Sequence, residues 1–320
     1  MNAKKSMTPG GLSNRDPFGR RIRNYFLTFK KVQLKKYFWL FLLPTATAFT
    51  LGFLWPFVRG IYLSFCEFRN IKSARFIGFD NYINALKDTG FVRSFIYTVA
   101  FTVISVILVN LLAFAVAYVL TRGIKGSNLF RTVFFMPNLI GGIVLGYIWQ
   151  LIINGALQWY AGQDITYSST YGFWGLIILM CWQQVGYMMI IYIAGLQSVP
   201  DHLVEASKID GASGFATLKN VILPYVRTSI TICTFLTLTN SFKLYDQNEA
   251  LTAGRPIEIL SNGSQVKTTS MIAKNIVDNF AETYASSNGT AQAKAVIFFL
   301  VVVVISLFQL YFTRRREIEQ

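Results

Sequence analysis

Long apolar runs without any Asp, Glu, Lys or Arg alternate along this chain with shorter polar segments. The hydrocarbon core of a bilayer is about 30 Å thick and takes roughly 20 residues of helix, so an uncharged run of that length is a candidate membrane span. Runs long enough lie at residues 37–58, 94–121, 132–163, 165–200 and 295–313. A shorter run at 228–242 is extended by apolar neighbours on both sides. The pattern predicts an all-α polytopic membrane protein with six transmembrane helices.

The six spans define the expected organisation of the chain. We place them at about residues 38–58, 94–121, 132–153, 172–197, 226–246 and 295–313. A basic N-terminal extension at 1–36 precedes the transmembrane domain at 37–316, and a short tail at 317–320 follows it. Apolar residues at helical spacing in the extension are typical of a helix on an anionic membrane surface, although a floppy basic tail fits equally well. Residues 268–281 have an apolar rhythm that predicts an amphipathic helix outside the bilayer.

Composition supports this class, and the charge distribution gives an orientation. The 320 residues are 53% hydrophobic and 14% charged, with a net charge of +15. Six spans put both termini on one side, and that side holds nineteen of the thirty Lys and Arg residues, which leaves +13 there and +2 opposite once Asp and Glu are subtracted. The positive-inside rule therefore predicts cytoplasmic N- and C-termini. The basic residues reflect orientation in the membrane, and nucleic acid is not an expected partner.

Side chains able to perform chemistry are scarce. The cysteines Cys66, Cys181 and Cys233 are odd in number and scattered, and His202 has no partner near it in the sequence. We therefore predict no metal site, no catalytic site and no enzymatic activity.

The segment from Glu205 to Ala212 is polar although it lies in the loop at residues 198–224, between two predicted spans, and Leu223-Pro224 closes this loop. It resembles the cytoplasmic coupling loop of ABC importer permeases, which has the pattern E-A-A-x-x-x-G-x(9)-I-x-L-P. Five residues match at the right spacing: Glu205, Ala206, Gly211, Leu223 and Pro224. Ser207 replaces the second alanine, and Val221 replaces the isoleucine.

Further landmarks extend the resemblance across about residues 36–316. They look like those of the sugar-permease family, the maltose and glycerol-phosphate importer type, in order and spacing. The segments are Lys36–Phe38 with Leu42–Pro44, Phe76–Tyr82, Phe130–Pro137 and Gly195–Pro200. The chain has Gly254-Arg255-Pro256 where the family usually has Gly-Gly-Pro, which leaves the conformation of that loop open.

The resemblance implies a type I ABC importer permease fold in a bacterial-type cell membrane. It also implies two ATPase subunits, an extracytoplasmic sugar-binding protein and a second permease subunit, which in the family is usually a related but different chain, with a homodimer as the alternative. The sequence has no phosphate loop G-x-x-x-x-G-K-[ST], so Mg-ATP is expected only on the ATPase partners and this chain needs no cofactor of its own. In the family, the coupling loop docks on the ATPase and drives alternating access. The expected coupling residues here are Glu205, Ala206, Ser207, Asp210, Gly211, Leu223 and Pro224. We expect Asp201 to cap the helix of this loop.

Polar residues inside apolar spans are candidates for the substrate pathway, because polar side chains that face lipid are costly. The fourth and fifth predicted spans offer Trp182, Gln183, Gln184, Tyr187, Thr237, Asn240 and Ser241. Their amides, hydroxyls and rings suit a sugar, but hydrogen bonding between helices is at least as good an explanation for each one.

The sequence therefore predicts the membrane subunit of a binding-protein-dependent importer for a sugar or oligosaccharide. A different solute, such as glycerol phosphate or a polyamine, remains an alternative. The spans contain few basic residues, which favours a neutral substrate over glycerol phosphate. A proton-coupled secondary transporter is a weaker alternative, because it would need carboxylates deep in the spans.

Overall fold

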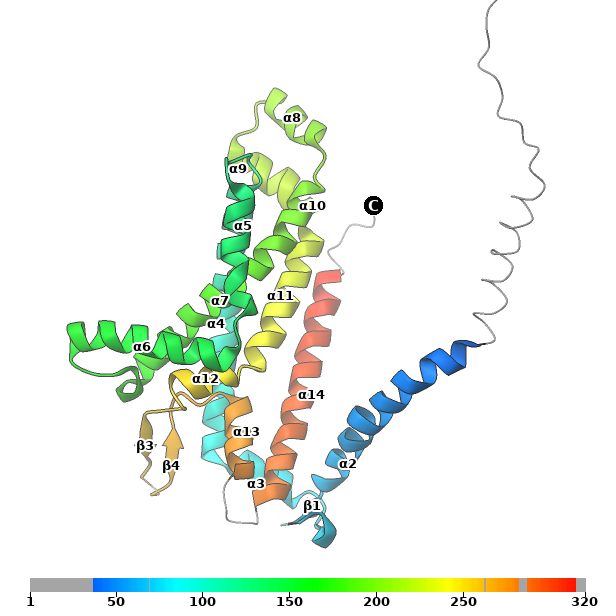
Figure 1. The fold of residues 1–320 in the computed structure, drawn as a ribbon, viewed down its shortest axis with the longest axis vertical. Helices are drawn as coiled ribbons and strands as arrows, with labels where there is room; N and C mark the ends of the chain where they lie inside the picture. Colours follow the sequence, from blue (N-terminus) through cyan, green and yellow to red (C-terminus); the bar gives the residue numbers. More distant parts are fainter. Residues whose placement is uncertain (1–36, 69, 262, 282–286, 315–320) are drawn as a thin grey trace, which may run out of the picture. The chain divides into compact units, whose positions relative to one another are not determined.

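The structure is a computed structural model that describes residues 37–68, 70–261, 263–281 and 287–314 (Figure 1). The predicted N-terminal extension at 1–36 and the tail at 317–320 lie outside these residues. The chain divides into two compact units, residues 1–60 and 61–320.

The described part of the first unit is helical. A helix over residues 37–49 continues through a π-helical turn, η1 (Thr50–Leu54), into α2 (Trp55–Leu63), the end of which belongs to the second unit. Tyr37–Leu63 is long and apolar enough to cross a membrane. The range predicted for the first span, 38–58, is helical throughout.

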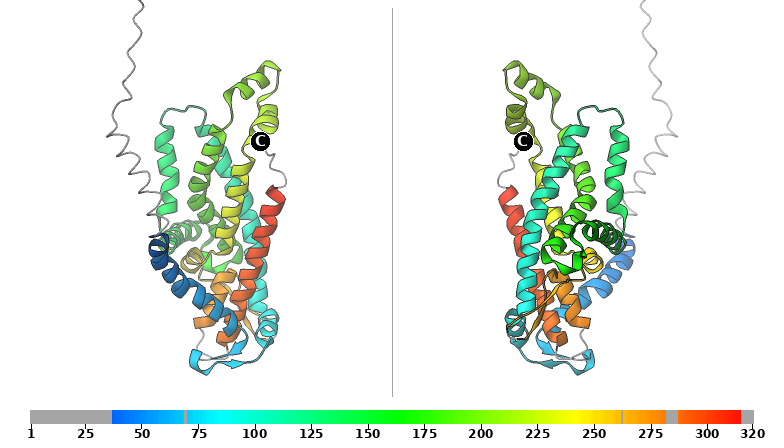
Figure 2. Two further views of the ribbon diagram at one scale, coloured as in Figure 1. Left: turned by 90° about the vertical axis from the view of Figure 1, so that its right-hand side faces the viewer. Right: turned by 90° about the vertical axis from the view of Figure 1, so that its left-hand side faces the viewer.

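Four long helices form the body of the second unit: α4 (Thr89–Leu120), α7 (Ser169–Gln197), α11 (Arg227–Phe242) and α14 (Ser287–Arg314) (Figures 1 and 2). The most buried of the candidate spans is α7, which packs along α4. The buried face of α4 has one residue every four positions. Its side chains become smaller along the helix, from Phe101 through Ser105 and Val109 to Ala113 and Ala117. Small residues on such a stripe let two helices approach closely, which is how spans associate in a membrane.

The third predicted span is bent. It consists of α5 (Ser127–Phe135) with the 3₁₀ turn η3 (Met136–Leu139), followed by α6 (Gly142–Ala161) at an angle of 103°. Pro137 has no N–H for a continuing helix, and Gly141 is extended. Figure 1 shows α6 crossing the direction of α5 and α7. A straight helix over 132–153 is therefore not what the structure contains.

The direction of α6 follows from its contact with α12 (Asp246–Leu251). A Cβ atom on Gly142 would lie 2.7 Å from Cβ of Asp246, and one on Gly146 would lie 2.5 Å from Cβ of Ala250. Only glycine leaves room for this approach. A comparable contact joins α7 to α5, where a Cβ on Gly186 would lie 1.8 Å from the carbonyl oxygen of Phe134.

Between α7 and α11 the chain forms α8 (Asp201–Ile209), α9 (Gly214–Thr217), the π-helical turn η5 (Leu218–Ile222) and α10 (Leu223–Tyr225). The stretch Gly214–Tyr225 bends by 72° into Arg227–Phe242. Four helices of the described chain are thus long and apolar enough to span a membrane, and the number rises to six if each bent pair counts as one span.

The end of the unit opposite α8 carries short elements, and we call it the hairpin end (Figure 1). One hairpin pairs β1 (Cys66–Glu67) with β2 (Arg75–Phe76), with η2 (Ile71–Ser73) between them and α3 (Asp80–Lys87) after them. The second pairs β3 (Ile257–Ile259) with β4 (Gln265–Lys267), and Ile257 lies opposite Lys267. The turn η4 (Ile165–Tyr167) precedes α7. The Arg255–Pro256 peptide, in the loop whose conformation the sequence left open, is cis.

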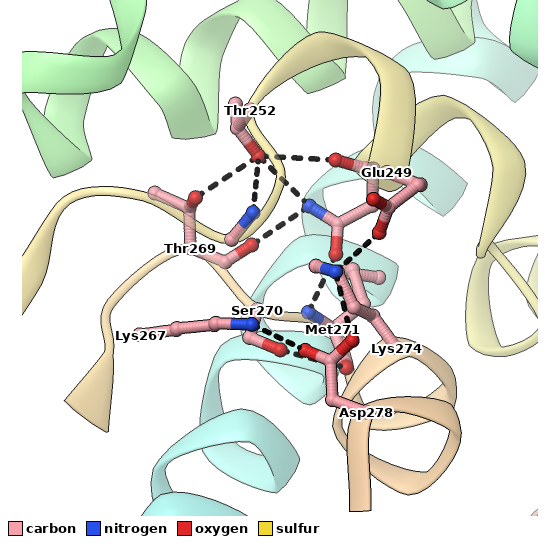
Figure 3. A network of polar contacts seen from close by, with 10 residues as sticks. Glu249, Thr252, Lys267, Thr269, Ser270, Met271, Lys274 and Asp278 are labelled. Carbon is pink, nitrogen blue, oxygen red and sulfur yellow. Dashed lines mark hydrogen bonds and ion pairs between the residues drawn. The ribbon is translucent and has the colours of Figure 1, made fainter. Parts of the chain in front are cut away.

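The predicted amphipathic helix is present as α13 (Ile272–Ala281), and an ionic network holds it (Figure 3). The side chain of Lys274 is buried and contacts the carboxylates of Glu249, on α12, and Asp278. Lys267 donates to Asp278 at 2.7 Å. Burial alone would lower the pKa of Lys274, but the hydrogen bonds to Glu249 and Asp278 outweigh it and raise that pKa. Lys274 is therefore charged at neutral pH.

A second buried lysine joins three helices. Lys294 of α14 pairs with Asp88, the residue that caps α4 by accepting from the N–H of Gly90 at 2.8 Å. Its ammonium group also contacts Asn279 of α13 and lies 5.5 Å from the centre of the Phe91 ring. This pairing fixes the hairpin ends of α4, α13 and α14 to one another.

Candidate functional site

The loop that carries the predicted coupling residues contains a short, well-terminated helix, α8. Its last turn ends in a Schellman motif: the N–H of Gly211 donates to the carbonyl of Lys208 at 3.1 Å, and that of Ala212 donates to Ser207 at 2.9 Å. Gly211 has a φ of +76°, in the left-handed region that favours glycine. The glycine of the motif is thus explained by the backbone, which turns sharply there.

The start of α8 differs from the prediction. Pro200 occupies the N-cap position, with no side-chain hydrogen bond, and Asp201 is already the first helical residue. The predicted capping role of Asp201 is therefore wrong, because Asp201 lies one residue after the N-cap position. Asp201 still carries its negative charge in the first turn, where the helix dipole favours it.

Ser207, at the position of the motif's second alanine, faces the inside of the loop. Its hydroxyl donates to the carbonyl of Val204 at 2.8 Å and lies 3.0 Å from the hydroxyl of Thr217, a buried residue at the end of α9. Ser213 caps α9 by accepting from the N–H of Ala216 at 3.2 Å. The contact between Ser207 and Thr217 joins α8 to α9 on the returning side of the loop.

The opposite side of the loop is exposed and chemically mixed. Glu205, Ala206 and Asp210 are exposed on or beside α8. Ile209 is 85% exposed and Phe215 is 74% exposed, although both are large and apolar. Figure 1 shows α8 projecting beyond the helical body of the second unit. An acidic residue beside exposed apolar side chains is typical of a protein contact surface.

Sequence reasoning missed Ile209 and Phe215. The available signal was their apolar character inside an otherwise polar loop. Leu223 and Pro224, by contrast, are half-buried in α10 at the 72° bend. They shape the return of the loop, and they lie away from its exposed side.

Most polar side chains proposed for the pathway bond to one another or to nearby backbone. Asn240 donates to the side-chain carbonyl of Gln184 at 3.3 Å, which joins α11 to α7. Gln183 accepts from Gln247 of α12 at 2.8 Å. Thr237 and Ser241 donate to carbonyls one turn earlier in α11. The structure therefore brings these residues together as contacts between and within helices.

Trp182 and Tyr187 differ from that group. Trp182 is 45% exposed and packs edge-to-face on Trp149 of α6, with 5.6 Å between the ring centres. Tyr187 is half-buried beside the core. Of the seven residues proposed for the pathway, Trp182 presents the largest exposed aromatic surface. A role in substrate contact stays a prediction for all seven.

Sequence reasoning also missed a polar contact that joins three helices. The hydroxyl of Tyr192 donates to Asn110 of α4 at 2.7 Å, and the amide of Asn110 reaches the carbonyl of Val106 at 2.7 Å and the hydroxyl of Thr237 at 3.5 Å. The signal was a lone asparagine in the second apolar run. These hydrogen bonds connect α4, α7 and α11 within the part of the chain that we expect to lie in the hydrocarbon core.

Comparison with known proteins identifies the chain's relatives. A family model described as the binding-protein-dependent transport system inner membrane component matches residues 110–318. The chain belongs to this family. It is a transport subunit, as the sequence predicted.

Two relatives cover almost the whole of this permease. The probable starch degradation products transport system permease protein AmyD of Thermoanaerobacterium thermosulfurigenes is 41% identical over 292 residues, which are 88% of this chain and 96% of the relative. The multiple sugar-binding transport system permease protein MsmF of Streptococcus mutans is 29% identical over 301 residues, which are 91% of this chain and 100% of the relative.

A solved structure confirms the predicted fold class. One chain of a bacterial alginate ABC transporter, in complex with an alginate pentasaccharide-bound periplasmic protein, matches the permease with a TM-score of 0.71. The two chains are 18% identical, and the match covers 90% of the permease and 97% of the other chain. The permease therefore has the type I ABC importer permease fold.

Among the described residues of the permease, no group of three or more His, Cys, Asp or Glu side chains is arranged to hold a metal ion. Cys66, Cys181 and Cys233 are free thiols. The exposed α8 loop and the aromatic and polar side chains of α7 remain the places where function is best sought.

Proposed function

We propose that this permease carries a sugar or oligosaccharide across the cell membrane as one of two homologous permease subunits of a binding-protein-dependent ABC importer. The relative AmyD, whose name refers to starch degradation products, supports the substrate class at 41% identity, and MsmF supports it more distantly. The scarcity of basic residues within the spans fits a neutral solute.

The observation that carries this proposal is the geometry of α8. A nine-residue rod, closed by a left-handed glycine and exposing Glu205 beside Ile209, is suited to lie in a groove of another protein. We assign that groove to a separate ATPase subunit that binds Mg-ATP, with Glu205 paired to a basic residue there. Closure of two such ATPases would pull α8 and shift the spans between inward- and outward-facing states.

The orientation in the membrane follows from the charge distribution. The side with the +13 charge excess includes both termini and the α8 loop, so we place them in the cytoplasm and the hairpin end outside. An extracytoplasmic sugar-binding protein would then deliver substrate to the hairpin end.

The test is to purify the permease from its native membrane and identify the chains that accompany it. We expect a second permease, an ATPase and a binding protein, and ATP hydrolysis that a sugar stimulates. The charge-removing variant Glu205→Gln should reduce this stimulation, because it removes an interfacial ion pair without changing shape. His202→Gln, also exposed on α8, is the matched control.

Glycerol phosphate and a polyamine serve as competing substrates in the same assay. A complex that responds to either one and to no sugar would refute the substrate class. A complex that contains no ATPase would refute the coupling role of α8.

A further inference from the structure

A cavity of about 350 Å³ opens at the hairpin end of the second unit. It lies between the first turns of α4, the start of α7 and the β3–β4 hairpin. Its size is at the lower end of the range of roughly 300–1,000 Å³ usual for small-molecule sites. None of the residues that line it is among the coupling or pathway residues discussed above.

Two oppositely charged side chains form one wall of the cavity. Arg93 of α4 donates to the carboxylate of Glu258 on β3 at 2.7 Å. The side chain of Arg93 is 43% exposed and that of Glu258 is 54% exposed, so both can reach a ligand. Because the two charges compensate each other, the wall offers strong donors and acceptors without a net charge. Such a wall suits a neutral ligand that has many hydroxyl groups.

Hydroxyl groups at the start of α7 add to this polar surface. Ser169 and Thr170 line the cavity, and neither side chain has a hydrogen-bond partner among the described residues. Thr268, after β4, also lines it but donates to the carbonyl of Pro256 at 3.0 Å. Ser169 and Thr170 can therefore donate to or accept from a ligand without breaking an existing bond.

The remaining wall of the cavity is aromatic. Phe173 packs edge-to-face on Tyr97 at 5.5 Å and on Trp174 at 5.7 Å between ring centres. The hydroxyl of Tyr97 is buried and has no hydrogen-bond partner among the described residues. Aromatic rings beside hydroxyl and charged groups match the two chemical surfaces of a pyranose, which has an apolar C–H face and a hydroxyl rim.

We propose that this cavity is a binding subsite for one neutral sugar unit. The sugar would bind here before it passes between the helices. Glu258, Ser169 and Thr170 accept from sugar hydroxyls, Arg93 donates to them, and Phe173 covers the C–H face. This inference rests on the proposed function, because it places the subsite on the extracytoplasmic side of a sugar importer.

The test measures sugar binding by the full chain in lipid nanodiscs, with maltotriose as the probe. Calorimetric titration is repeated on Arg93→Gln, Glu258→Gln and Phe173→Leu. The matched control is Lys267→Gln, which removes a cation of similar exposure (40%) and identical pairing distance (2.7 Å) that does not line the cavity. Exposed ion pairs contribute little to stability, so the charge variants should fold normally.

We expect wild type and Lys267→Gln to bind maltotriose with equal Kd. Arg93→Gln and Glu258→Gln should raise Kd by roughly tenfold or more, because each removes hydrogen bonds to a charged group. Phe173→Leu should weaken binding several-fold, because it keeps an apolar side chain but loses the ring face.

Three results would overturn the subsite: no maltotriose binding by wild type, equal Kd in the Arg93 and Lys267 variants, or tighter binding of sn-glycerol 3-phosphate than of maltotriose. The proposed function is judged separately, by sugar-stimulated ATP hydrolysis of the purified complex. If that stimulation is present while Arg93→Gln and Glu258→Gln bind maltotriose like wild type, the subsite alone is refuted.

Discussion

Replacing Gly211 by Ala tests whether the left-handed end of α8 is what makes the loop a rigid connector. Nothing lies within 4 Å of a Cβ at this position, so the substitution creates no clash. Its cost is confined to the backbone, because φ is +76°. An L-residue in the left-handed region costs about 1–2 kcal/mol relative to glycine. A penalty of that size changes the population of the folded turn by roughly 5- to 30-fold.

The structure supplies a matched control in the same loop. Gly214, at the start of α9, also has open space around a Cβ, but its φ is not positive. Gly214→Ala therefore makes the same chemical change without backbone strain. Gly211→Asn provides a rescue, because asparagine tolerates the left-handed region better than alanine does.

Two measurements report the effect of Gly211→Ala on the turn at the end of α8. Hydrogen exchange at the amides of Gly211 and Ala212, which close the Schellman motif, should accelerate in Gly211→Ala by about the factor given above. Sugar-stimulated ATP hydrolysis by the complex should fall with it, while Gly214→Ala keeps both properties and Gly211→Asn recovers part of them. If the two alanine variants behave alike, the glycine conformation does not govern the loop, and the reasoning is wrong.

Three further predictions concern the helical body. Gly186→Ala should lower the melting temperature markedly, because a Cβ 1.8 Å from the carbonyl oxygen of Phe134 must force α5 and α7 apart. Gly155→Ala, which places its Cβ in open space, is the control and should melt like the wild type. Equal melting temperatures of the two variants would contradict the close contact. Lys294→Met should cost about 1–3 kcal/mol of stability, seen in chemical unfolding, because Asp88 loses its buried partner, and an unchanged midpoint would argue against the pairing. Asn240→Ala should reduce thermal stability and all activities together, whereas loss of sugar-dependent transport alone would return Asn240 to the pathway.

The sequence predicts the short helix α8 and most of the long helices well because their signals are local, whereas the coupling role of the α8 loop stays a prediction. Uncharged runs locate α4, α7 and α14, since the bilayer sets both their length and their composition. The position of Gly211 and the helix before it follow from residue types within one segment. The Asp201 cap was wrong by a single position, which is the usual uncertainty of a helix boundary.

The path of α6 could not be predicted in the same way. Pro137 signals an interruption, but nothing near it in sequence specifies a bend of 103°. The direction depends on the contact of Gly142 and Gly146 with α12, about one hundred residues later. A hydropathy pattern reports that a segment is apolar, and it does not report which other segment it touches.

Pairing between polar residues was hidden for a related reason. Gln184 and Asn240 each have a polar side chain of the kind expected in a substrate pathway, yet they form a hydrogen bond with each other. The charged wall formed by Arg93 and Glu258 joins residues 165 positions apart, so neither one stands out in the sequence. Only the fold shows which polar groups are already satisfied and which remain open to a ligand.

The ion pairs of Lys274, Lys267, Lys294 and Arg93 all lie at the hairpin end, far from α8. The ion pairs of the described residues are thus concentrated where the chain would meet substrate, while α8 is held to the rest of its loop by hydrogen bonds between neutral groups. A force applied at α8 would therefore act on a helical body whose opposite end is held together by ion pairs. Added salt should screen the exposed Arg93–Glu258 pair but leave the pairs of the buried Lys274 and Lys294 side chains nearly intact, so the hairpin end should stay joined at high ionic strength.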